Sequence, residues 1–115
     1  MSRELENRAF IFAKEVRIFC RKLKWELINA EDIKQLIRSS GSVAANYIEA
    51  NENLGKADLR MKIKISRKEA KESILWLSLL EVDGSDELAK EKSRLINEAQ
   101  QLRKILSAIL NKLEQ

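Results

Sequence analysis

The chain has 115 residues but no proline and only three glycines, and this scarcity constrains its fold more than any other feature. A β-sandwich or barrel reverses direction many times, and its tight turns depend on those two residue types. The other residues are mainly Leu, Ile, Ala, Glu, Lys and Arg, most of which favour helix. The sequence therefore predicts an all-α fold, and its length fits a single domain over residues 1–115.

Apolar residues recur every three or four positions along four stretches, as they do on the buried face of a helix. We expect helices over residues 4–28, 31–53, 56–82 and 86–113, joined by short links. Asp32 is placed to help the second helix start, Gly55 suits the left-handed residue after its end, and Ser85 can cap the fourth. Short links return each helix alongside the previous one, which predicts an antiparallel up-down-up-down four-helix bundle.

Residues 38–42 read Arg-Ser-Ser-Gly-Ser and interrupt the second stretch with weak helix formers. One interpretation is a loop that splits the helix. The other is a continuous helix whose small residues let a neighbouring helix approach closely; these are Ser39, Ser40, Gly41, Ala44 and Ala45. We favour the continuous helix because the apolar spacing passes through the region without a shift of phase.

Some apolar residues lie away from the main stripes of the first and third helices. They are Ile11, Ile18, Trp25, Met61, Ile65 and Trp76. A broad core face with scattered exposed residues is one explanation. A second buried surface between subunits is the other, and we favour it because two helices each carry a tryptophan there.

The formal net charge is +4, and residues 1–74 carry the excess, with 16 basic against 11 acidic residues. Two basic stripes have helical spacing: the first is Arg60, Lys64, Arg67, Lys68 and Lys71, and the second is Lys14, Arg17, Arg21 and Lys24. Such rows can meet the phosphates of RNA or DNA, although an ordinary solvated face has the same pattern. Few aromatic residues are available to stack on bases, so we expect contact with the backbone and little sequence preference.

The sequence lacks the usual residues of catalysis and metal binding. It has no histidine, no phosphate-binding glycine loop, and a single cysteine, Cys20, with apolar neighbours that indicate packing. Nothing in the pattern brings Glu49, Glu52 or Glu69 to a catalytic partner. We therefore expect no enzyme activity, no catalytic residues, no cofactor and no metal. The charged N-terminal residues, the short apolar runs and the lone thiol favour a soluble cytoplasmic protein.

Four stretches together resemble a known family. Residues 35–50 read QLIRSSGSVAANYIEA and carry the most specific part; residues 6–13, 68–77 and 97–106 add ENRAFIFA, KEAKESILWL and NEAQQLRKIL. This pattern resembles the bacterial four-helix-bundle proteins encoded in intervening sequences of large-subunit ribosomal RNA genes. The accessory variability protein of diversity-generating retroelements is similar to that family.

The resemblance implies a four-helix bundle that assembles as a ring-like homo-oligomer, a homopentamer, with basic character. For the retroelement relatives it also implies binding to nucleic acid and to a reverse transcriptase. It marks Arg38, Asn46 and Glu49 as notable polar positions, which we interpret as hydrogen-bonding groups at helix contacts. This chain has Leu23-Lys24-Trp25 where such proteins often have Leu-Pro.

Two functions of different kinds follow. One is a basic, homo-oligomeric, nucleic-acid-associated adaptor, and the other is a structural or protein-docking oligomer without a nucleic-acid role. The surroundings of the Arg60–Lys71 stripe discriminate between them: an open stripe favours the adaptor, and a stripe neutralised by acids of another helix favours the docking oligomer.

Overall fold

Four α-helices make up most of residues 2–115, the part of the chain that the computed structural model describes. They are α1 (Arg3–Arg21), α2 (Leu27–Asn51), α3 (Lys56–Leu79) and α4 (Asp86–Leu113), and this described part contains no strand. The all-α prediction with four helices is confirmed. None of these helices combines the length and apolar character that a membrane crossing requires.

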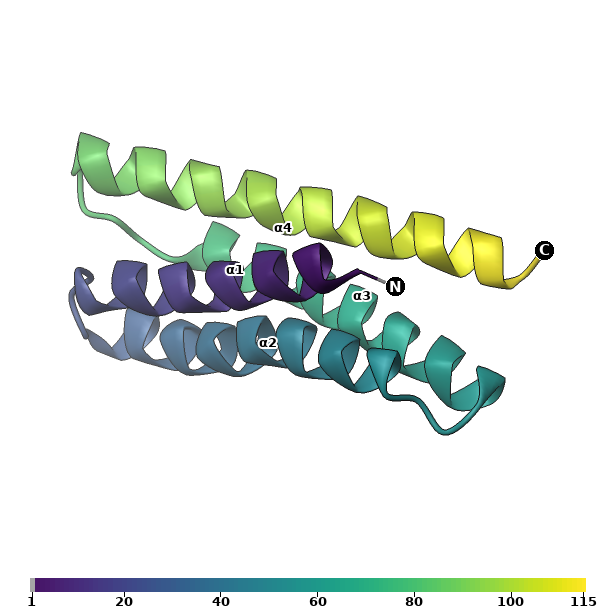
Figure 1. Ribbon diagram of the computed structural model, residues 1–115. Coiled ribbons are helices and arrows are strands. Elements are labelled where there is room, and N and C mark those ends of the chain that lie inside the picture. Colours follow the sequence, from purple (N-terminus) through teal and green to yellow (C-terminus); the bar gives the residue numbers. More distant parts are fainter. Residues whose placement is uncertain (1) are drawn as a thin grey trace.

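The helices lie side by side in an elongated body of 46 × 21 × 20 Å (Figure 1). The connecting loops alternate between its two ends, and both termini lie at the same end (Figure 1). Cross-helix partners follow this course. Arg8 and Glu15 of α1, and Lys22 just after its end, meet Glu98, Arg94 and Glu91 of α4, so that the residue numbers rise along one helix and fall along the other.

The predicted apolar stripes form the core. The stripe of the first helix is buried throughout, from Leu5 through Phe12 and Phe19 to Leu23. The fourth helix buries Leu95, Ala99, Leu102, Leu106 and Leu110 at three- and four-residue spacing. Each large side chain that is withdrawn from water stabilises the fold by about 1.5–3 kcal/mol before chain entropy is counted. This burial holds the four helices together.

Two serines cap helices through their hydroxyl oxygens. Ser2 Oγ accepts a hydrogen bond from Leu5 N at 3.0 Å, and Ser85 Oγ accepts one from Leu88 N at 3.2 Å. Acidic residues occupy the first turn of both helices, where they face the positive end of the helix dipole. The cap predicted at Ser85 and the bounds predicted for the fourth helix are confirmed.

The predicted end of the first helix is wrong. The helix stops at Arg21, and Leu23, which lies in the loop that follows, is buried in the core. Asn29 lies inside α2, not in a link between helices. Its side-chain amide donates to Glu81 O at 2.9 Å and its Oδ1 accepts from Glu81 N at 3.1 Å. Asn29 thereby ties the α1–α2 and α3–α4 loops together, which explains why a residue typical of turns is buried in a helix.

Other predicted helix ends also shift. The second helix starts at Leu27, which leaves Asp32 beyond its first turn. The third helix stops at Leu79 rather than at residue 82, because Leu80 turns extended into the core and Lys92 Nζ donates to its carbonyl at 2.8 Å. Gly55 precedes α3 with φ 135° and ψ 174°, so it does not adopt the predicted left-handed helical conformation.

The small-residue stretch of α2 is continuous helix, as we favoured from the sequence. Ser39 and Ser40 are fully buried, and Ser39 Oγ lies 2.8 Å from Ser73 Oγ of α3. On the side toward α1, a Cβ atom added to Gly41 would lie 3.1 Å from Arg17 Nη2. Small side chains therefore let two neighbouring helices approach α2, although Ala45, which we included in this set, is exposed.

We predict that Gly41→Leu destabilises the protein by about 1–3 kcal/mol, because the new side chain displaces the Arg17 guanidinium from its carbonyl partners. Leucine also favours helix over glycine by about 1 kcal/mol, which offsets part of this loss. Thermal and urea unfolding measure the change. Ala45→Leu, on the exposed side of the same helix, is the control and should leave stability nearly unchanged. Equal midpoints for both variants would refute close packing at Gly41.

Candidate nucleic-acid interface

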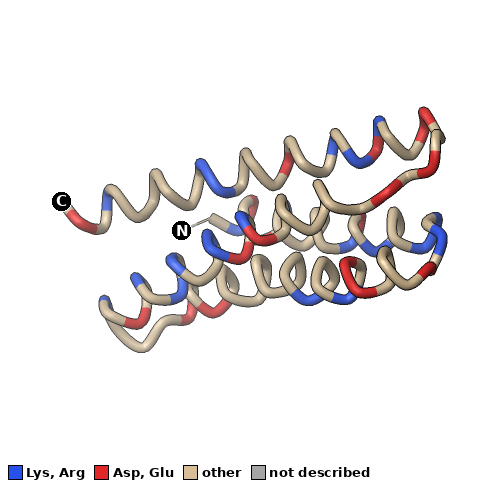
Figure 2. The backbone as a smooth tube through the Cα atoms, turned by 180° about the vertical axis from the view of Figure 1, so that it is seen from behind, with Lys and Arg blue, Asp and Glu red and all other residues tan. Residues whose placement is uncertain are grey.

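The basic stripe of α3 borders a hollow between α3 and α4. The hollow has a volume of about 340 Å³, and its lining is Lys64, Arg67, Lys68, Lys71, Arg103 and Ser107. The stripe thus faces α4 along one flank of α3. Figure 2 shows the basic residues recurring along the helix, with acidic ones fewer among them. The lining contains five cations and no acid.

None of these five cations forms an ion pair within residues 2–115. The Ser107 hydroxyl forms no hydrogen bond within the same residues. Lys64, Lys68 and Lys71 are exposed, whereas Arg67 is half-buried. Like charges that face each other across a helix contact repel, and nearby water screens them only in part. The hollow is therefore a place where an anion would relieve repulsion.

Arg60 differs from the rest of its stripe. Its Nε lies 4.0 Å from Glu114 Oε1, and the same nitrogen is buried without a hydrogen-bond partner. This is the one predicted member of the stripe with an acid at ion-pair distance in the described chain. The stripe therefore comprises one cation beside an acid and four open ones.

The second predicted stripe is less uniform. Lys14 and Arg21 are exposed on α1, but the Arg17 guanidinium donates to Ala13 O at 2.9 Å and to Ile37 O at 3.2 Å. Arg17 therefore holds the α1–α2 contact. Lys24 lies on the loop beyond α1 and pairs with Asp83 at 3.9 Å, so helical spacing does not place it with the others.

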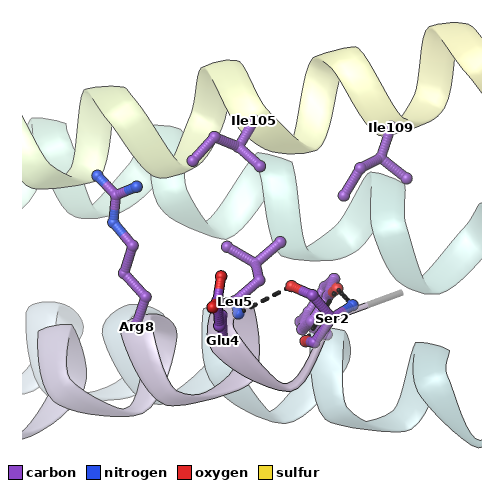
Figure 3. A pocket seen from close by; sticks show the side chains of 7 residues that line it. Ser2, Glu4, Leu5, Arg8, Ile105 and Ile109 are labelled. Carbon is purple, nitrogen blue, oxygen red and sulfur yellow. Dashed lines mark hydrogen bonds between the residues drawn. The ribbon is translucent and has the colours of Figure 1, made fainter.

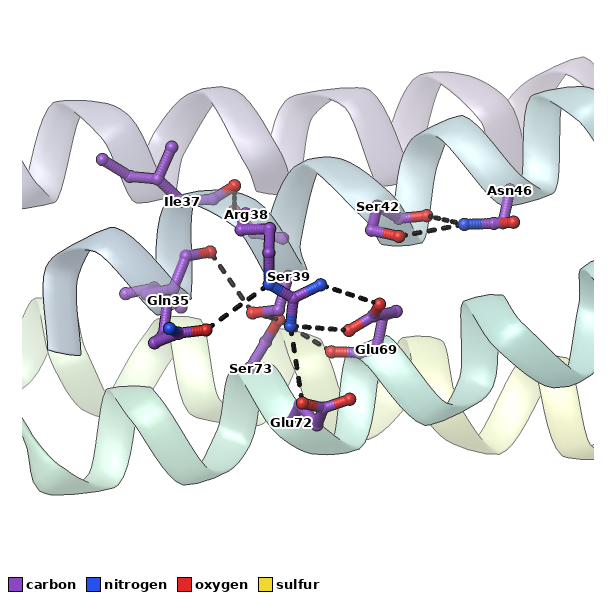
Figure 4. Close-up of polar contacts among 11 residues, drawn as sticks. Gln35, Ile37, Arg38, Ser39, Ser42, Asn46, Glu69, Glu72 and Ser73 are labelled. Carbon is purple, nitrogen blue, oxygen red and sulfur yellow. Dashed lines mark hydrogen bonds and ion pairs between the residues drawn. The ribbon is translucent and has the colours of Figure 1, made fainter. Parts of the chain in front are cut away.

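A cluster on the opposite flank of α3 engages the acids of that helix (Figure 4). Arg38 of α2 donates to both oxygens of Glu69, at 3.0 and 3.3 Å, and reaches Glu72 at 3.4 Å. The Glu69 carboxylate is nearly buried, at 7% exposure, and its hydrogen bond raises the pKa of Arg38 above the ordinary value. This cluster joins α2 to α3.

The other two polar positions marked by the family pattern also make contacts within the chain. Asn46 donates to the carbonyl and hydroxyl oxygens of Ser42, each at 2.9 Å (Figure 4). Glu49 accepts from Lys62 of α3 at 3.2 Å. Arg38 and Glu49 therefore bridge two helices as expected, whereas Asn46 bonds within its own helix.

The predicted subunit-contact residues separate into two groups. Ile11, Ile18 and Met61 are exposed on helices, with 52%, 43% and 56% of their surface accessible, and Trp25 is 57% exposed on the α1–α2 loop. The third-helix pair, Ile65 and Trp76, is half-buried, and Trp76 packs against the core of its own chain. The seven-residue spacing of Ile11, Ile18 and Trp25 thus runs past the end of α1.

A second hollow lies where α4 extends past the start of α1 (Figure 3). It has a volume of about 360 Å³, and Leu5, Ile105 and Ile109 give it an apolar lining. Its main polar groups already have partners: Arg8 binds Glu98 at 2.7 Å, and the Tyr47 hydroxyl accepts from Ser2 N at 3.0 Å. This hollow is therefore largely apolar, whereas charged and hydroxyl side chains line the α3–α4 hollow.

The sequence profile of the 23S rRNA-intervening sequence protein family matches residues 3–108. The chain belongs to this family. A solved structure from Bacteroides thetaiotaomicron, described as a protein of unknown function from the S23 ribosomal protein family, superimposes with a TM-score of 0.77. It is 27% identical, and the superposition covers 92% of this chain and 97% of that one. The resemblance seen in the sequence is thus confirmed at the level of the family.

This member of the 23S rRNA-intervening sequence protein family is also similar to two curated proteins. Centromere protein S of Mus musculus is 34% identical over 91 residues, which is 77% of this chain and 61% of that protein. Centromere protein S of Bos taurus is 39% identical over 57 residues, which is 50% of this chain and 41% of that protein. The chain thus spans less than two thirds of either relative.

Cys20 is buried, and burial raises the pKa of its thiol to about 11. Because the thiolate is the reactive form, we predict very slow alkylation of the native protein at about pH 8, accelerating as the pH approaches the pKa. In the unfolded chain the pKa returns to about 8.5 and alkylation becomes fast. Mass spectrometry after iodoacetamide treatment, with and without urea, measures the difference. Equal rates in both conditions would refute a protected thiol.

Proposed function

We propose that the protein is a non-enzymatic, homo-oligomeric adaptor that binds the phosphate backbone of RNA or DNA through the α3–α4 flank. The observation that carries the proposal is the gathering of five unpaired cations at one hollow. Phosphate contacts of this kind give affinity without sequence preference. The proposal places the adaptor in the cytoplasm, with a reverse transcriptase as the candidate protein partner by analogy with the retroelement accessory proteins.

The surroundings of the stripe support the adaptor over the docking oligomer. Apart from Glu114 beside Arg60, no acid within residues 2–115 lies at ion-pair distance from its cations. Some cations elsewhere are engaged, for example Arg38 with Glu69 and Arg94 with Glu15, whereas others, such as Lys14 and Lys90, form no ion pair within residues 2–115. The α3–α4 hollow is distinguished by its grouping, because five cations line one place with no acid among them, and this favours an external anion.

The proposal includes a finer architecture: an antiparallel up-down-up-down bundle that assembles into a ring-like homopentamer. The opposite order of partners on α1 and α4 supports the first part. Exposed Ile11, Ile18 and Met61 support association, because apolar side chains exposed to water gain stability when another copy covers them. Five copies of one cationic flank would also strengthen weak phosphate contacts through multivalency.

We predict that replacing Lys64, Arg67 and Lys71 together with glutamine weakens binding to RNA and to DNA. Each lost phosphate contact lowers the salt dependence, so the slope of log K against log salt should fall by about 2 for single strands. Fluorescence anisotropy across a salt series measures both effects. The matched control replaces Lys90, Lys104 and Lys112 of α4, which removes the same charge outside the hollow. If both variants bound like the parent, the stripe would be an ordinary solvated face.

We also predict that light scattering of the purified protein gives about five times the 13.3 kDa mass of one chain. Ile18→Glu should lower this mass, because a charge in a buried subunit contact lacks a partner. Asn97→Glu, at an exposed position of α4, is the control and should leave it unchanged. A stable monomer at micromolar concentration would end the oligomer proposal.

A further inference from the structure

The α3–α4 hollow differs from a flat basic stripe because it receives cations from two helices. Lys64, Arg67, Lys68 and Lys71 come from α3, and Arg103 and the hydroxyl of Ser107 come from α4. A phosphate on a convex helix meets donors on one side only. Inside the hollow, the same group can meet donors from two directions.

Toward the two ends of the α3–α4 contact, cations lie beside carbonyl or carboxylate groups. Near one end, Lys92 Nζ donates to Ser78 O at 3.1 Å and to Leu80 O at 2.8 Å. Near the other end, Arg60 lies beside Glu114. Between them, the seam presents charges of one sign, with Arg67 and Lys71 facing the Arg103 side of α4. This unbalanced section is where a bound anion stabilises the protein.

The amount of positive charge indicates which kind of phosphate fits. An internal phosphodiester carries about one negative charge. A terminal phosphate monoester carries about −1.5 to −2 at neutral pH and offers three strong acceptor oxygens. The five cations and the Ser107 hydroxyl can supply donors to all three terminal oxygens of a monoester, whereas a phosphodiester presents only two. Charge-assisted bonds from arginine and lysine to a monoester are strong because both partners are ionised.

We propose that the α3–α4 hollow binds the terminal phosphate of a nucleic-acid strand. Arg103 and Ser107 of α4 contact this phosphate from one side, and the cations of α3 contact it from the other. This assignment rests on the proposed nucleic-acid function and makes it more specific. The cations of α3 contact internal phosphates where no strand end is present, and a terminal phosphate in the hollow also engages Arg103 and Ser107 of α4. The protein therefore distinguishes a phosphorylated end from a hydroxyl end without reading bases.

The test compares two short single-stranded RNAs of one sequence, both labelled at the 3′ end, with either a phosphate or a hydroxyl at the 5′ end. At constant ionic strength, the parent should bind the phosphorylated strand about tenfold more tightly, as expected for added charge-assisted hydrogen bonds. Arg103→Gln and Lys68→Gln should each reduce this preference. Lys104→Gln, which removes the same charge from the neighbouring exposed position, should keep it.

The outcomes separate this inference from the proposed function. Equal binding of the two strands by the parent overturns the strand-end assignment and leaves the backbone-binding function standing. No binding of either strand overturns the function itself. A loss of affinity in Arg103→Gln that is the same for both strands makes Arg103 a general phosphate contact and overturns the assignment.

If adenosine 5′-monophosphate competed as tightly as the phosphorylated strand, the hollow would be a site for a free nucleotide, and the strand-end assignment would be overturned. Circular dichroism of every variant confirms that the helices remain, so a lost preference reflects the site. Inorganic phosphate should raise the melting temperature of the parent more than that of Arg103→Gln, because binding to the native state stabilises it.

Discussion

The close contact between α2 and α3 determines where the charges of the protein lie. Buried serine hydroxyls sit in this contact: Ser39 Oγ lies 2.8 Å from Ser73 Oγ, and Ser66 Oγ donates to Val43 O at 2.8 Å. Larger side chains would separate the helices, and Arg38 could no longer reach both oxygens of Glu69. This contact turns the acids of α3 toward α2, which leaves the opposite flank of α3 to its cations.

The acids of α4 are drawn away from the same seam by a second set of contacts. Glu98 pairs with Arg8 of α1 at 2.7 Å, and Glu91 pairs with Lys22, just after the end of α1, at 3.1 Å. Exposed ion pairs of this kind contribute little to stability, typically below about 1 kcal/mol. Their consequence here is for the charge pattern, because they engage Glu91 and Glu98 on the α1 side of α4, whereas Arg103 lines the hollow toward α3. The basic hollow thus follows from where the acids of both helices are engaged.

The sequence predicts the four helices and most of the core because apolar spacing reports burial directly. It fails near Leu23, which continues the stripe although the helix has already ended. Asn29 falls in the link expected between the first two helices, whereas the structure places it in α2, because turn preference does not reveal a tertiary partner such as Glu81. The cations of α3 could be placed on one face, but Arg103 could not be joined to them. A helical wheel shows which residues share a face of one helix, but it does not show which neighbouring helix that face meets.

A ring of identical subunits would give the two kinds of phosphate contact different consequences. A strand has one 5′ end, so one subunit at most can hold that end in its hollow, while the α3 flanks of the others meet internal phosphates. Multivalent backbone contacts would then supply most of the affinity and its dependence on salt. The occupied hollow would fix where the strand begins. An adaptor that reads no bases can position a strand in this way, because a terminal phosphate is a unique feature of any sequence.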